Sequence, residues 1–116
     1  MEQPKLFDRK KIESREDAER LALFALGEFQ ARGKALAGRV LPLDRLRGAL
    51  RRAAEVFESE ELSDESAVAA FSSLGAQVSR VPTFVAKHPY RVTVRDELAE
   101  RARRFFDEKL ASTSEG

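Results

Sequence analysis

The feature that most constrains the fold is an unbroken apolar run at residues 21–26, which lies inside a predicted helix. We expect this helix to span Arg15–Ala31, because Ser14-Arg-Glu-Asp17 has the form of a capping box with an acidic first turn. Its apolar side chains cover most of the circumference: Ala18, Leu21, Ala22, Leu23, Phe24, Ala25, Leu26 and Phe29. A helix that is apolar all round lies at the centre of a core or beneath a second subunit.

Two further helices are predicted in the middle of the chain. The first begins near Pro42 and has one apolar seam at spacings of three and four, formed by Leu43, Leu46, Leu50, Ala53 and Phe57. The next has Ser63 as its expected N-cap and Gly75 as its expected stop, and its apolar side chains are mostly small. Both helices can cover the central one.

The residues after Gly75 are mostly β-branched or aromatic, and Tyr90, Val92 and Val94 alternate with polar residues as in a half-buried strand. We expect a two-stranded hairpin there, with a turn at Lys87 and His88. A second capping box, Thr93-Val-Arg-Asp96, predicts a last helix that ends near Leu110, with i,i+4 ion pairs Glu97/Arg101 and Glu100/Arg104.

These elements predict a mainly α fold of the α+β class, with about four helices and one short β-hairpin between the third and the last helix. We expect an N-terminal arm over residues 1–13, a single helix-rich domain over 14–110 and a disordered tail over 111–116. Whether the arm is ordered, through Leu6, Phe7 or Ile12, stays open.

Composition excludes several classes of protein. The chain has no Cys, and its net charge of +1 does not mark it as a nucleic-acid binder. The basic start of the chain, through Lys5, Arg9, Lys10 and Lys11, is followed by no apolar segment of signal-peptide length. We therefore expect a cytoplasmic protein without a membrane span.

The sequence contains no pattern typical of catalysis. The single histidine, His88, has no neighbouring cluster of metal ligands, and no serine lies in a nucleophile elbow. The six glycines form neither a dinucleotide-binding nor a P-loop motif. We therefore expect no enzyme, with no catalytic residues, no cofactor and no metal, although paired catalytic carboxylates stay open.

Charge is nevertheless segregated along the chain. Residues 39–52 carry five positive charges and one negative, residues 55–65 carry six negative charges, and residues 80–95 carry four positive charges. Such blocks either solvate surface faces or create local potentials that attract a partner.

The first hypothesis is a non-catalytic protein-interaction or adaptor module with a regulatory role, which self-associates as a homodimer. Its excess apolar surface would come from the first and last helices, and small chains with such surfaces commonly form two-fold dimers. The candidate interface residues are Leu23, Phe24, Leu26, Phe105 and Phe106. The hairpin edge could also accept a strand from a partner. The alternative for the apolar run is a central core helix.

The alternative function is DNA binding. The order helix, helix, helix, hairpin resembles the general winged helix-turn-helix arrangement, in which a recognition helix enters the major groove and a basic hairpin touches the backbone. The candidate nucleic-acid or acidic-partner contacts are Arg45, Arg47, Arg51, Arg52, Arg80, Lys87 and Arg91. The third helix is poor in side chains that read base edges.

Overall fold

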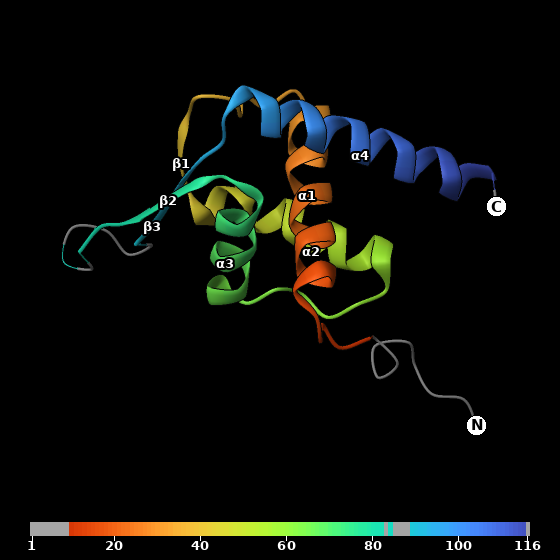
Figure 1. Cartoon of the computed structure of the whole chain (residues 1–116), viewed down its shortest axis with the longest axis horizontal. Helices are drawn as coiled ribbons and strands as arrows, with labels where there is room; N and C mark the ends of the chain where they lie inside the picture. Colours follow the sequence, from red (N-terminus) through yellow and green to blue (C-terminus); the bar gives the residue numbers. More distant parts are fainter. Residues whose placement is uncertain (1–9, 83, 85–88, 116) are drawn as a thin grey trace.

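The computed structural model describes residues 10–82, 84 and 89–115, with side chains up to Ser112. The described residues form four α-helices, one 3-10 helix and three strands (Figure 1). In chain order these are α1 (Arg15–Ala31), β1 (Val40–Pro42), η2 (Leu43–Leu46), α2 (Arg47–Phe57), α3 (Asp64–Leu74), β2 (Gln77–Arg80), β3 (Tyr90–Thr93) and α4 (Asp96–Glu115). The α+β class with four helices is as predicted.

The central helix α1 has the predicted bounds and the predicted cap. The Ser14 hydroxyl accepts a hydrogen bond from the Asp17 N–H at 3.1 Å, which satisfies one of the free donors of the first turn. Residues 21–29 are all buried, because α2, α3 and α4 each pack against α1 (Figure 1). The helix is thus apolar all round because other helices of the same chain surround it.

Helices α1 and α4 cross at a close backbone approach. A Cβ atom at Gly27 would overlap the carbonyl oxygen of Ala102 and the Cβ of Phe106, so the crossing requires a residue without a side chain. The Phe24 ring lies 5.0 Å from that of Phe106 and 5.7 Å from that of Phe57, measured between centroids. The aromatic centre of the core therefore joins α1, α2 and α4.

The hairpin of β2 and β3 is confirmed, but a third strand, β1, was missed. The strand order is β1-β3-β2. Val92 of the central strand β3 pairs with Leu41 of β1 on one side and with Val78 of β2 on the other. Pro42, expected in the first turn of a helix, is the last residue of β1. A three-residue strand that contains proline has no alternation of its own, and its pairing with β3 stabilises it.

The expected free edge of the hairpin falls on β2, which lies at the edge of the order β1-β3-β2, and not on β3. Strand β3 is central and pairs on both sides, so its backbone offers no edge to a partner. The predicted turn at Lys87 and His88 lies outside the described residues. Val92 and Val94, which are 1% and 0% exposed, anchor β3 and the connection to α4 in the core.

The end of α3 follows the prediction, whereas both ends of α4 differ from it. Ser63 caps α3 by accepting from the Ser66 N–H at 3.1 Å, and Gly75 adopts the expected left-handed conformation with φ of 109°. Helix α4 begins at Asp96 and not after Thr93, because Thr93 pairs within β3; the Arg95 carbonyl accepts the first helical hydrogen bond.

Helix α4 also ends at Glu115 and not near Leu110, so residues 111–115 of the expected tail are helical. Adding a residue to the end of a formed helix costs less free energy than starting a new helix, so small polar residues can continue α4. Of the expected arm, Lys10 exchanges backbone hydrogen bonds with Glu58 and Glu60, and Ile12 packs against the core. Leu6 and Phe7 lie outside the described residues.

Within the described part of the chain, no helix combines the length and the apolar character needed to cross a bilayer.

Candidate functional site

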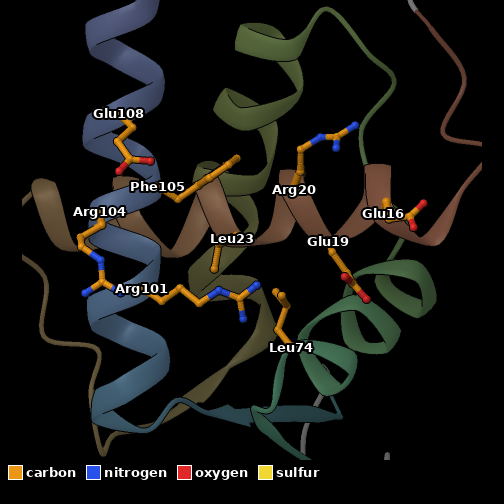
Figure 2. Close-up of a pocket in the computed structure, with 9 residues that line it drawn as sticks. All are labelled: Glu16, Glu19, Arg20, Leu23, Leu74, Arg101, Arg104, Phe105 and Glu108. Carbon is orange, nitrogen blue, oxygen red and sulfur yellow. The ribbon is translucent and has the colours of Figure 1, made fainter.

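A groove of about 340 Å³ lies in the angle between α1 and α4, beside the end of α3 (Figure 2). Helix α1 forms one wall, α4 forms the other, and three apolar side chains lie between them. The lining residues are Glu16, Glu19, Arg20, Leu23, Leu74, Arg101, Arg104, Phe105 and Glu108. This volume is within the range of sites that hold a small ligand or an anchoring side chain.

The floor of the groove is apolar and comes from three helices. Leu23 of α1 is 6% exposed, while Leu74 of α3 and Phe105 of α4 are half-buried. The Phe105 ring is stacked on Phe57 of α2, with 6.5 Å between centroids and 15° between planes. The floor is therefore held by core packing, and its outer surface stays open to a partner.

The α1 wall is acidic. Glu16 is exposed and forms no ion pair among the described residues, and Glu19 accepts a hydrogen bond from the Ser73 hydroxyl of α3. Arg20 also lies on this wall, but its guanidinium is bound to Asp17 at 2.8 Å. The neutralised Arg20 leaves the two glutamates as the dominant charges of α1 here.

The α4 wall carries two arginines, Arg101 and Arg104, and one glutamate, Glu108, so its net charge is positive. Arg101 and Arg104 are exposed, and neither forms an ion pair within the described ranges, so the expected pairs with Glu97 and Glu100 are wrong. Arg103 of α4 is instead bound to Asp107 of the same helix at 3.4 Å. Figure 2 shows the Arg101 side chain extending from α4 across the groove toward Leu74.

Most of the predicted basic contacts are bound within the chain. Arg47 forms ion pairs with Glu61 at 3.1 Å and Asp64 at 2.5 Å, and donates to the Leu62 carbonyl at 2.7 Å. Arg51 lies 3.9 Å from Glu61. The acidic segment after α2 thus folds back on the basic helix, and the two charge blocks neutralise each other.

Arg52 is part of an ionic cluster around the buried carboxylate of Glu28. Its Nε donates to Glu28 Oε2 at 2.6 Å, as does Nε of Arg32, and its Nη2 donates to Glu28 Oε1 at 3.1 Å. Burial alone raises the pKa of Glu28, but hydrogen bonds from Arg52 and Arg32 lower it to below the ordinary value of 4.5. The cluster ties α1 to α2 and has a structural role.

The remaining predicted basic residues lie on η2 and on the hairpin. Arg45 is exposed on η2 without an ion pair among the described residues. Arg80 lies over the Tyr90 ring at 5.5 Å, and Arg91 donates to the Tyr90 carbonyl at 3.2 Å, both near the hairpin. Lys87 lies outside the described residues.

The predicted apolar interface is mostly core. Phe24 and Leu26 are 1% and 0% exposed, and Phe106 is 8% exposed, so they form no outer surface of this chain. The physical reason is that α1 is covered by three helices, as the core-helix alternative stated. Of the five residues, Leu23 and Phe105 do line the groove.

Sequence reasoning missed the charged walls because it assigned the α4 arginines to pairs along their own helix. The spacing of Arg101, Arg104, Phe105 and Glu108 places them on one side of α4, which was the available signal. What faces that side depends on the crossing at Gly27, and no local pattern gives a crossing angle.

An apolar centre within a charged rim is the usual anatomy of a protein interface. No group of three or more His, Cys, Asp or Glu that could hold a metal ion occurs in the described part of the chain, and His88 lies outside it. Comparisons with protein-family models, curated proteins and solved structures found no match to this chain.

Proposed function

We propose that this chain is a non-catalytic protein-interaction module that binds its partner in the groove between α1 and α4. The observation that carries the proposal is the combination of an apolar floor with two charged walls of opposite sign. Leu23, Leu74 and Phe105 can take up an apolar anchor, and the side chains around them can fix its orientation. The module would act in the cytoplasm as an adaptor or regulatory protein.

The groove is favoured over the other large depression of the surface. A hollow of about 610 Å³ lies between the start of α1 and α3, but small Ser and Ala side chains make up much of its lining. Such side chains offer few contacts that distinguish one partner from another. The groove instead combines a half-buried aromatic ring with arginines, the residue types enriched where interfaces gain most of their energy.

A second candidate function is DNA binding, which the topology favours. The order α1, β1, α2, α3, β2, β3 with sheet order β1-β3-β2 resembles the winged helix-turn-helix arrangement, with α3 in the place of the recognition helix. The chemistry of α3 argues against it, because its exposed side chains are acidic or small: Asp64, Glu65, Ser66, Ala69, Ser72 and Ser73. These lack the bidentate donors that read base edges.

A gel-shift titration with duplex DNA at about 50 mM and about 200 mM salt separates the two candidates. The interaction module predicts no complex at either salt concentration. A salt-sensitive complex that weakens on substitution of Arg80 or Arg91 would favour the second candidate, since these residues lie on the hairpin.

The groove itself is tested by affinity purification from cells that express the protein. The groove variant carries Arg101→Glu and Arg104→Glu; the matched control carries Arg95→Glu and Arg103→Glu, which change the net charge equally outside the groove. We expect bound proteins, including untagged copies of the chain, to be retained by wild type and control and lost from the groove variant. Equal retention by all three would contradict the proposal.

A further inference from the structure

Helix α4 extends beyond the body that it packs on. Its buried side chains, Leu98, Ala99, Ala102 and Phe106, all lie at or before Phe106, near the middle of the helix. No side chain over residues 107–112 is buried, and Leu110 is 42% exposed. Figure 1 shows this end of α4 projecting past α1 and α2. Lys109 lies over the Phe57 ring of α2 at 4.7 Å, so this segment is held at the surface of the body and not in its core. A helical segment with little burial is only marginally stable in water, and further burial by a partner would stabilise it.

The walls of the groove carry complementary charges that do not meet within one chain. Glu16 and Glu19 of α1 line the same groove as Arg101 and Arg104 of α4, together with Glu108 of α4 and with Arg20 of α1, which is bound to Asp17. No ion pair joins the two walls in the described part of the chain. The groove between the walls has a volume of about 340 Å³, which is enough for further side chains. An occupant that satisfies both walls must therefore present a basic face to α1 and an acidic face to α4.

The chain itself has both of these faces. In a two-fold symmetric dimer, every contact occurs twice: if one surface of the first copy touches a second surface of its partner, then the same surface of the partner touches the second surface of the first copy. The α4 arginines of a second copy can approach Glu16 and Glu19, while the α1 glutamates of that copy approach Arg101 and Arg104. Phe105 of each copy would meet the apolar floor of the other.

We propose that the groove binds α4 of a second copy of this chain, so that the protein is a two-fold dimer. This inference rests on the proposed function of the groove and names its partner. The dimer would bury the apolar floor under a ring of reciprocal ion pairs and would pack the exposed end of α4. Charge complementarity would also make the association weaken with salt.

The experiment is a charge exchange measured by sedimentation equilibrium. The acidic variant carries Arg101→Glu and Arg104→Glu, and the basic variant carries Glu16→Arg and Glu19→Arg. Each variant alone places like charges against each other twice, so we expect its dimer dissociation constant to rise at least about 100-fold. An equimolar mixture restores both contacts, and we expect a heterodimer of nearly wild-type affinity. The control with Arg95→Glu and Arg103→Glu should dimerise like wild type.

Three results would overturn the proposal: a wild-type protein that is monomeric up to about 1 mM, variants that dimerise like wild type, or a mixture that does not associate. A chain that carries all four substitutions provides a further readout, because it exchanges the walls within one molecule and should dimerise again. Circular dichroism of each variant checks that its helices are intact.

The two proposals fail in different ways. The wild type could be monomeric and still bind other proteins that the variant with Arg101→Glu and Arg104→Glu does not bind. The groove would then bind a different protein, and only the proposal that its partner is a second copy would be rejected. If neither association nor capture depends on these arginines, the proposed function fails as well.

Discussion

Helices α2 and α4 are both rich in arginine, yet they use it differently. Arg47 and Arg52 of α2 are bound to carboxylates of the same chain at distances of 3.1 Å or less, whereas Arg101 and Arg104 of α4 form no ion pair among the described residues. The charge of a helix therefore does not show how much of that charge a partner can reach.

The difference arises from what lies opposite each helix. Helix α2 has Glu28 of the central helix on one side and the acidic segment from Glu58 to Asp64 at its end, so its guanidinium groups meet partners on folding. The groove side of α4 faces the α1 wall, and no ion pair joins the two walls among the described residues. Arginines of α2 should accordingly contribute to stability, and those of α4 to binding.

The largest effect is expected where α4 crosses α1. Gly27→Ala should lower the free energy of unfolding by about 3 kcal/mol, because the added methyl group overlaps the backbone of Ala102 and forces the helices apart. The matched substitution in α2 is Gly48→Ala, where the new Cβ overlaps no backbone atom and lies 3.4 Å from the Arg52 guanidinium that Glu28 holds. It should change stability by less than about 1 kcal/mol, because the gain in helix propensity offsets a small displacement of Arg52.

Urea denaturation followed by circular dichroism measures both variants. Equal effects at the two glycines would show that the crossing tolerates a side chain, and that the position of the α4 wall is less fixed than the structure indicates.

The second effect concerns the ionic cluster that joins Arg52 of α2 to the buried carboxylate of Glu28. Glu28→Gln or Arg52→Ala should cost about 2 kcal/mol, because each removes hydrogen bonds between charged groups and leaves a partner poorly satisfied. Arg101→Ala, the control on α4, should change stability by less than about 0.5 kcal/mol. A similar loss at Arg101 and Arg52 would contradict the division between structural and available arginines.

The same cluster predicts a dependence of stability on pH. The pKa of Glu28 is lower in the folded chain than its ordinary value of 4.5, so the charged carboxylate stabilises the fold fully above that pH. The contribution is lost as the pH falls through the folded pKa. The stability difference between wild type and Glu28→Gln should therefore be constant near neutral pH and shrink below 4.5. A difference that is unchanged in acid would show that the Glu28 charge does not carry the effect.

Local signals predicted much of this fold. The bounds of α1, the caps at Ser14 and Ser63 and the stop at Gly75 each depend on residues within one turn, and all are confirmed. Strand β1 could not be predicted this way, because its three residues are extended only through pairing with β3. Thr93 was misplaced for a related reason: its capping pattern competes with a strand that uses the same residue.

The candidate site was harder to predict than the fold. The charge blocks were visible, but the sequence does not show that residues 58–64 fold back on α2 and neutralise Arg47. The groove depends on the angle at which α1 and α4 cross. The local sequence signal for this crossing was Gly27, a glycine in the middle of a strongly apolar helix. Distances between elements decide which charges remain available, and these come only from the folded chain.

The smallest expected effect separates two arginines within α2. Arg47, with its side chain 23% exposed, contacts two carboxylates and a carbonyl, whereas Arg51 is 62% exposed and lies 3.9 Å from Glu61. Arg47→Ala should therefore lower the free energy of unfolding by about 1 kcal/mol, and Arg51→Ala by less than about 0.3 kcal/mol, because solvent screens the looser pair. Raising the salt concentration should reduce the first loss only in part, since Arg47 keeps its hydrogen bond to the Leu62 carbonyl. Equal losses at the two positions would mean that helix propensity, and not ion pairing, determines how much each arginine of α2 contributes to stability. Arg51 would then be as available to a partner as Arg101.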